Sequence, residues 1–178
     1  MLLVIEITAM FRRVALFVLV FSVLQLAWQA GTETNGARMF IEKTIVAPAA
    51  FIINRATPAV QAYASGSHLR SPGGGINIIN GCDGMELLFL LIAGFSVAPL
   101  AWRSRIRGVL AGMPLIYVLN QARILALFYS NRNDPDLFDA LHGFVAPLAM
   151  VLLIAAYFYI WLFRAQRVDA ALIDSPLP

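Results

Sequence analysis

The feature that most constrains the fold is the run Leu141–Phe163, 23 residues that include no Asp, Glu, Lys or Arg. About 20 consecutive apolar residues are enough for a helix to cross the hydrocarbon core of a bilayer. Of the 178 residues in the chain, 60% are hydrophobic and only 13% are charged. Soluble domains are roughly half apolar and a quarter charged, so the excess of apolar surface indicates a membrane protein.

Further apolar runs accompany this one. The first of these runs, at residues 14–30, could instead be a signal peptide that is cleaved off. Against this, Trp28 stands where a cleavage site needs a small residue. We therefore expect an all-α, polytopic membrane protein with a loop subdomain on the exported side. Residues 1–178 are predicted to form a single membrane domain with four spans, at residues 14–30, 85–102, 108–129 and 141–163, and a cytoplasmic tail at residues 164–178.

Residues 31–80 are the least hydrophobic part of the chain. A fifth span over Ile45–Ala62 is the alternative, but it would hold Asn54 and Arg55 near the middle of the bilayer, which is costly. An amphipathic helix at the membrane interface suits this composition better. The sequence Pro72-Gly73-Gly74-Gly75 then predicts a small hairpin or irregular loop.

Basic residues predict the orientation, because Lys and Arg beside membrane spans are enriched on the cytoplasmic side. With four spans, three basic clusters fall on one side, and they hold seven of the thirteen basic residues. This side is predicted to be cytoplasmic and to carry both termini, which leaves residues 31–80 on the exported side. The seven residues are Arg12, Arg13, Arg103, Arg105, Arg107, Arg164 and Arg167.

Composition also argues against several classes of site. Cys82 is the only cysteine, which excludes an intramolecular disulfide and a Cys-x-x-Cys redox site. His68 and His142 are the only histidines, so a metal centre is not expected. The net charge of +3 gives no indication of nucleic-acid binding. We expect no cofactor.

Three reactive side chains reach the same side of the membrane in this topology. Cys82 precedes the second span, and His142 opens the fourth. Arg123 lies about 23 Å along the third span, in the outer third of a core of about 30 Å. Each has an ordinary explanation: a lone cysteine is usually a packing residue, an interfacial histidine is often only solvated, and an arginine can extend to the surface.

Together, however, these side chains fit acyl transfer. A thiol with a pKa near 8.5 is a weak nucleophile at neutral pH unless a base or cation stabilises its thiolate. Histidine supplies the general base and then the acid, and a fixed arginine stabilises an oxyanion. The pattern predicts a thioester on Cys82, with His142 as acid and base and Arg123 at the oxyanion.

Two neighbouring polar residues are candidates for supporting roles. Asn120 lies one turn before Arg123 on the same helix face, where it could hold the guanidinium or a substrate carbonyl. Glu86 lies one turn after Cys82 and could pair with Arg123 or orient His142, although a plain interfacial carboxylate is an equal alternative.

At these residues the sequence resembles the exosortase/archaeosortase family of membrane-embedded protein-sorting enzymes. The resemblance spans about residues 80–163 and rests on Gly81-Cys82-Asp83-Gly84, on Leu119-Asn120-Gln121-Ala122-Arg123-Ile124 and on His142. It is closest to the small H-type exosortases. It implies a cysteine transpeptidase in the inner membrane of a prokaryote, with Cys82, Arg123 and His142 catalytic and Asn120, Glu86 and Gly84 supporting them.

The resemblance also implies the partners. Family substrates are exported proteins that carry a C-terminal motif, a transmembrane helix and a basic cluster; membrane lipid surrounds the enzyme. Two alternatives stay open. One is a non-enzymatic assembly factor or transporter subunit in which Arg123 is structural. The other is a membrane protease that transfers the acyl group to water.

Overall fold

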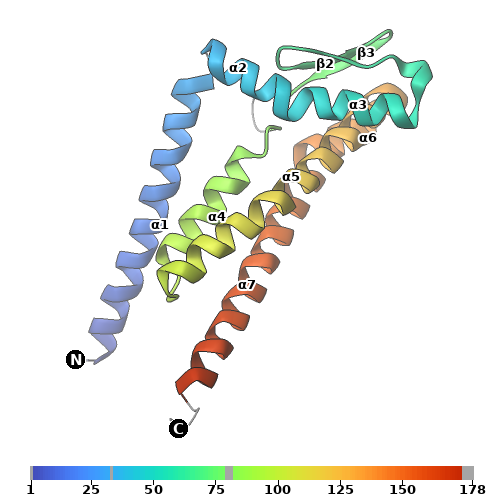
Figure 1. Cartoon of the computed structure of the whole chain (residues 1–178). Helices are drawn as coiled ribbons and strands as arrows, with labels where there is room; N and C mark the ends of the chain where they lie inside the picture. The colour runs from blue at the N-terminus through green and yellow to red at the C-terminus, as the bar shows by residue number, and fades with distance from the viewer. Residues whose placement is uncertain (1, 33, 79–81, 174–178) are drawn as a thin grey trace.

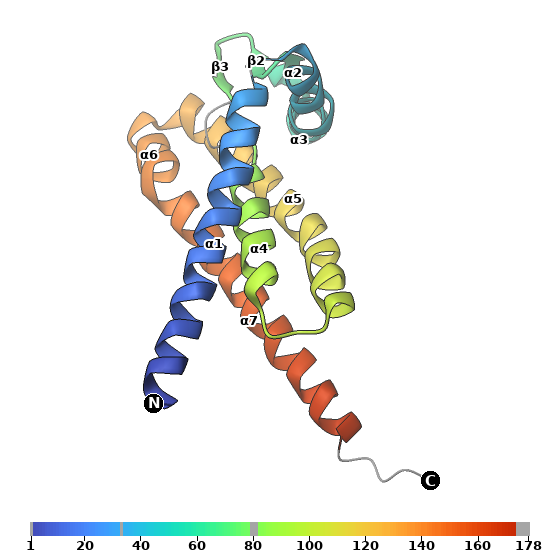
Figure 2. The same ribbon diagram turned by 90° about the vertical axis from the view of Figure 1, so that its left-hand side faces the viewer.

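The computed structural model of the chain describes residues 2–32, 34–78 and 82–173. Figure 1 shows long helices arranged side by side, with a shorter helix and a small sheet lying across one end. We call this the capped end and the opposite one the basic end. Both the first and the last described residues lie at the basic end (Figures 1 and 2).

The long helices account for most of the chain. They are α1 (Leu2–Thr32), α5 (Trp102–Asn133) and a helical segment made of α6 (Pro135–Ala140), the π-helical turn η3 (Leu141–Val145) and α7 (Ala146–Ile173). Within the described residues, these are the three helices long and apolar enough to cross a membrane. The fourth helix of the bundle, α4 (Met85–Val97), is apolar but has only 13 residues.

Helix α4 lies at the centre of the bundle, between α1 and the pair formed by α5 and α7 (Figures 1 and 2). Buried side chains of α4, α5 and α7, such as Leu91, Phe95 and Ile154, pack into one core cluster. At Gly112 of α5 a Cβ atom would come within 2.4 Å of the Leu91 side chain. The absence of a side chain at that glycine therefore allows α4 and α5 to pack closely.

The end of α4 differs from the predicted span at residues 85–102. The helix stops at Val97, because Pro99 disfavours helical geometry at Ala98, which is extended with φ −63° and ψ 138°. Helix α5 then begins at Trp102 and includes Arg103, Arg105 and Arg107, which lie between the second and third predicted spans. At 1.5 Å per residue, α4 is about 20 Å long, shorter than the hydrocarbon core.

The cap consists mainly of one amphipathic helical segment. It comprises α2 (Asn35–Ile41), the π-helical turn η1 (Glu42–Val46) and α3 (Ala47–Ala56). The Thr34 side chain accepts a hydrogen bond from the Ala37 N–H at 3.3 Å and so caps α2. Fully buried residues recur at Ile41, Ala49 and Ile53, and this face packs on the outer part of α5 and on the sheet.

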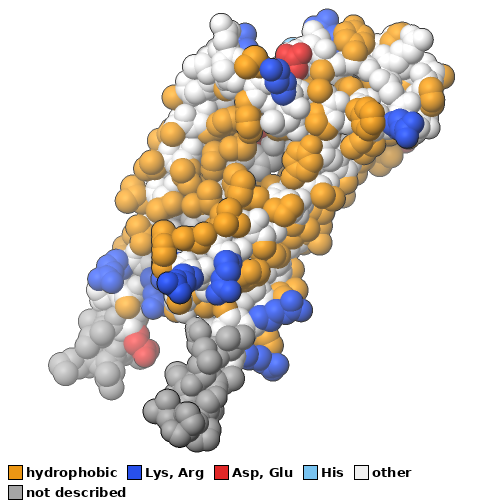
Figure 3. Space-filling view, viewed as in Figure 1, with side chains coloured by type: hydrophobic (Ala, Val, Ile, Leu, Met, Phe, Trp, Pro, Cys, Tyr) orange, Lys and Arg blue, Asp and Glu red, His pale blue; other side chains and the backbone are white. Residues whose placement is uncertain are grey.

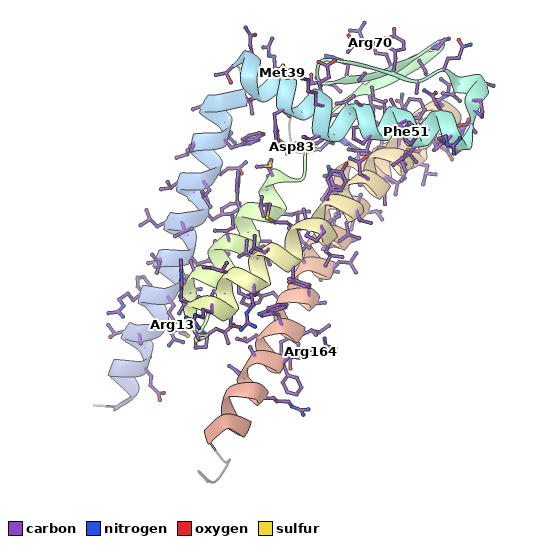
Figure 4. All side chains as sticks on the ribbon, in the orientation of Figure 1. Arg13, Met39, Phe51, Arg70, Asp83 and Arg164 are labelled. Atoms are coloured by element: carbon purple, nitrogen blue, oxygen red, sulfur yellow. The ribbon has the colours of Figure 1, made fainter. Side chains whose placement is uncertain are left out.

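The opposite face of this cap helix carries exposed apolar side chains, among them Met39 and Phe51 (Figure 4). The helix lies across the bundle (Figure 1) and ends at Ala56, before Pro58. The alternative of a fifth span over residues 45–62 therefore has no continuous helix to support it.

A three-stranded antiparallel sheet completes the cap. Its strands, in the order β1-β2-β3, are β1 (Tyr63–Ser65), β2 (His68–Ser71) and β3 (Gly74–Asn77), preceded by the short 3-10 helix η2 (Pro58–Val60). The two residues Pro72 and Gly73 connect β2 to β3, so the Gly-rich sequence forms a hairpin. Strand β1, which pairs with β2, had no prediction from the sequence.

The surface agrees with a membrane protein. Figure 3 shows a face on which hydrophobic side chains form a band between the two ends, with Lys and Arg side chains gathered at the basic end. Helix α7 continues to Ile173, so the predicted tail at residues 164–178 is helical up to that residue; its last five residues lie outside the described ones. The predicted fold class, an all-α polytopic membrane protein, is confirmed.

Candidate active site

Cys82 lies in the short connection between the sheet and α4, at the capped end of the bundle. Its side chain is only 3% exposed and belongs to a buried cluster that includes Ile124 and Phe128 of α5. The next residue, Asp83, accepts a hydrogen bond from the Met85 N–H at 3.1 Å through Oδ1. Asp83 thereby satisfies a backbone donor in the first turn of α4 and fixes the chain directly after the cysteine.

Gly84 allows the chain to turn into α4. Its φ of 79° lies in the left-handed region, where a side chain is strained. A Cβ atom here would also come within 3.0 Å of Cγ of Asn120 on α5. Both the backbone conformation and the lack of space beside Asn120 therefore require a glycine at position 84.

Helix α1 holds the two carboxylates that flank the turn. Trp28 donates from Nε1 to Oδ2 of Asp83 at 2.8 Å. One turn earlier, Gln25 donates from Nε2 to Oε1 of Glu86 at 3.2 Å. Because α1 packs mainly on α4, these side-chain hydrogen bonds link it directly to the segment that carries Cys82.

His142 approaches Cys82 from the other side of the bundle. It lies in the π-helical turn η3, and Asp134 begins this helical segment by accepting a hydrogen bond from the Leu137 N–H at 3.0 Å. The imidazole stacks on Phe138, with 5.5 Å between ring centroids and 4° between ring planes. Its Nδ1 lies 3.8 Å from Sγ of Cys82, within reach of a hydrogen bond to sulfur.

A cavity of about 310 Å³ lies beside this pair. Arg123 from α5, His142 from η3 and Glu86 from α4 all line it, together with Gly84. Its apolar wall is formed by Leu87, Pro147, Met150 and Val151. The cavity thus gathers a base, a guanidinium and a carboxylate. Cys82 is not among its wall residues, and His142 connects the cavity to the buried thiol.

Burial raises the pKa of the Cys82 thiol above its ordinary value. The positive charge of Arg123 lowers the pKa of this thiol, whereas Asp83 and Glu86 add to the rise. At neutral pH the sulfur is therefore protonated, and it needs a neighbouring base to become a nucleophile. His142 is within reach to act as this base.

The predicted site residues are not all in one place. Asn120 is 3% exposed and lines a second cavity, of about 150 Å³, on the side of Gly84 where α5 faces the cap helix. Its Oδ1 is buried and has no hydrogen-bond partner in the part of the chain that the structure describes. His68 lies in β2, and neither cavity has it in its wall.

The sequence alone did not indicate Trp28, Gln25 or Phe138. Trp28 and Gln25 are three residues apart in an apolar helix. Asp83, before α4, and Glu86, in its first turn, are also three residues apart. This matched spacing is a signal, but it becomes informative only when α1 is known to pack on α4.

As for metals, no group of three or more His, Cys, Asp or Glu residues among those described is arranged to hold an ion.

A comparison with protein families places the chain beside a known family. A family model described as a transmembrane exosortase matches residues 2–159 of the chain. Searches of curated proteins and of solved structures gave no match. The matched range includes Cys82, Arg123 and His142.

Proposed function

The chain belongs to the transmembrane exosortase family, and we propose that it cleaves exported proteins through a thioester on Cys82 and transfers them to an acceptor. Exosortases are membrane-embedded cysteine transpeptidases that act on exported proteins with C-terminal sorting signals. The observation that carries the proposal for this chain is the 3.8 Å approach of His142 Nδ1 to Cys82 Sγ, beside a cavity lined by Arg123.

The first half-reaction begins with a substrate peptide bond in this cavity. His142 takes the thiol proton, and Sγ of Cys82 attacks the carbonyl carbon. The negative charge that develops on the carbonyl oxygen is stabilised by Arg123. The C–N bond then breaks, His142 returns the proton to the leaving amine, and the acyl group remains on sulfur as a thioester.

The second half-reaction reverses these roles. An acceptor amine enters after the leaving peptide has departed, attacks the thioester carbonyl and gives its proton to His142. The C–S bond breaks, and the proton returns to sulfur, so that the thiol is restored. The cavity's apolar wall limits the water that competes with the amine.

The supporting residues act mainly on the geometry. Gly84 provides the left-handed turn that presents Cys82, and Asn120 packs against that turn. Glu86 is held by Gln25 at the rim of the cavity, where its charge opposes premature ionisation of the thiol.

The site is proposed to face the exported side of the inner membrane, with both termini in the cytoplasm. Arg13 and Arg164 lie together at one end of the bundle, and Asp83 lies near the cap (Figure 4). Because basic residues beside spans favour the cytoplasm, the capped end faces outward.

We expect a fluorescent protein fused after Pro178 to fluoresce and alkaline phosphatase fused there to be inactive. The opposite pair of results would invert the topology.

Replacing Arg123 with lysine is expected to remove most activity while the protein stays inserted and abundant. Lysine keeps the charge but lacks the planar fork that holds an oxyanion at a fixed angle. By the usual worth of one oxyanion donor, we expect kcat to fall about 10²- to 10³-fold. Single-turnover cleavage of a substrate peptide measures this. Near-normal cleavage by the variant would limit Arg123 to a structural role.

A further inference from the structure

A separate cavity of about 420 Å³ lies at the basic end of the bundle, far along α5 and α7 from Cys82. Three arginines line it, Arg103 and Arg107 from the start of α5 and Arg164 from α7. Its remaining wall is formed by Ala101, Ser104, Trp161 and Ala165. Figure 4 places Arg164 at this end, and Figure 3 shows the basic side chains gathered there.

The charge of this basic cavity is not balanced by its own wall. None of the acidic side chains that the structure describes lines it, so guanidinium groups from two helices converge without a carboxylate between them. Like charges around a common space repel one another, and an anion within the space would remove this cost. The arrangement therefore favours a negatively charged ligand.

Two arginines near the basic cavity, Arg105 and Arg167, are engaged elsewhere. Arg105 donates from Nε to the Leu100 carbonyl and from Nη1 to the Ser96 carbonyl, both at 2.8 Å, and so satisfies backbone groups after α4. Arg167 lies over the Phe163 ring at 4.2 Å. Arg107, which lines the cavity, donates one hydrogen bond to the backbone, from Nε to the Arg103 carbonyl at 3.3 Å.

The other polar groups of the wall are also donors. Ser104 carries a hydroxyl group, and the indole Nε1 of Trp161 is buried with no hydrogen-bond partner among the described residues. The Trp161 ring is held edge-to-face against Phe95, with 6.4 Å between centroids. An acceptor with several oxygens at one charged centre suits such a wall better than a single carboxylate does.

We propose that the basic cavity binds a phosphate group at the membrane surface. Guanidinium groups hold phosphate oxygens through paired hydrogen bonds, and basic pockets between helix ends hold the headgroups of anionic lipids. A phospholipid headgroup and free phosphate share this chemistry. The site is independent of the reaction at Cys82.

The test compares two charge reversals on α7. Arg164→Glu reverses a cavity-lining charge, and Arg167→Glu makes the same change three residues later, outside the cavity. Binding of phosphatidylglycerol to the purified full chain in detergent is measured by native mass spectrometry, with phosphatidylcholine as the zwitterionic reference. We expect Arg164→Glu to weaken phosphatidylglycerol binding about tenfold or more and Arg167→Glu to weaken it less than about threefold.

Equal weakening by both variants, or no preference of the wild-type chain for phosphatidylglycerol, would overturn the proposal. Competition by inorganic phosphate separates the two sources: displacement of the lipid shows that free phosphate suffices, and no displacement shows that the phosphate must be carried by a lipid. The double variant Arg103→Gln/Arg107→Gln repeats the test from α5. Cleavage at Cys82 is expected to persist in all three variants, so loss of lipid binding is distinct from failure of the proposed reaction.

Discussion

Replacing Cys82 with alanine is expected to abolish cleavage of the sorting signal, a loss of about 10⁴-fold or more. Without the sulfur no thioester forms, and His142 has no nucleophile to activate at its Nδ1. The measurement is accumulation of uncleaved substrate in cells and single-turnover cleavage with the purified chain.

The control for this variant is a check that the protein still folds and inserts normally. Cys82 is buried among Ile124 and Phe128, and alanine keeps the apolar packing while it removes one atom. We expect unchanged helical content and membrane abundance. Normal substrate processing by Cys82→Ala would contradict the proposed chemistry and would favour a non-enzymatic assembly factor.

Replacing His142 with alanine is expected to slow cleavage by about two to four orders of magnitude, the usual contribution of general acid–base catalysis. The residual rate should rise with pH. Because burial raises the pKa of the Cys82 thiol, the thiolate forms unaided only as the pH approaches this elevated value. The pH–rate profile of the variant is therefore expected to shift in the alkaline direction relative to the wild-type enzyme.

His68 provides the matched control, since it lies in β2 and in the wall of neither site cavity. We expect His68→Ala to reduce cleavage only slightly. A larger loss from His68→Ala than from His142→Ala would contradict the assignment of the base.

The sequence was sufficient to predict the features that depend on composition and charge. Apolar runs predicted the helices, and the basic residues at their ends predicted that Arg13 and Arg164 share one end of the bundle, as Figure 4 shows. The same topology placed Cys82 near His142, and the structure brings them to 3.8 Å. These predictions needed only helix length and the number of crossings.

The remainder depended on packing between distant segments. The end of α4 at Val97 follows from Pro99, but the apolar sequence continues beyond it and obscured the break. Strand β1 exists because it pairs with β2, which no local pattern reports. The hydrogen bond from Trp28 to Asp83 requires one particular face of α1 to be turned toward α4. The sequence of an almost wholly apolar helix gives little indication of which face that is.

The position of Asn120 is a similar case. One helical turn from Arg123, it was expected to serve the same site, yet it lines the cavity on the other side of Gly84. Helical spacing gives the face of a residue on its own helix, but the neighbouring chain decides which cavity that face lines. Glu86, in contrast, lines the same cavity as Arg123 and His142.

The most direct test of the thioester mechanism is mass spectrometry of the purified chain, acid-quenched during turnover of a substrate peptide without an amine acceptor. The proposed mechanism predicts an acyl adduct on the peptide that contains Cys82, released by hydroxylamine as expected for a thioester, and absent from Cys82→Ala. In His142→Ala the adduct should form on the same residue but more slowly. An adduct on any other residue, or cleavage at a normal rate by Cys82→Ala, would contradict this mechanism.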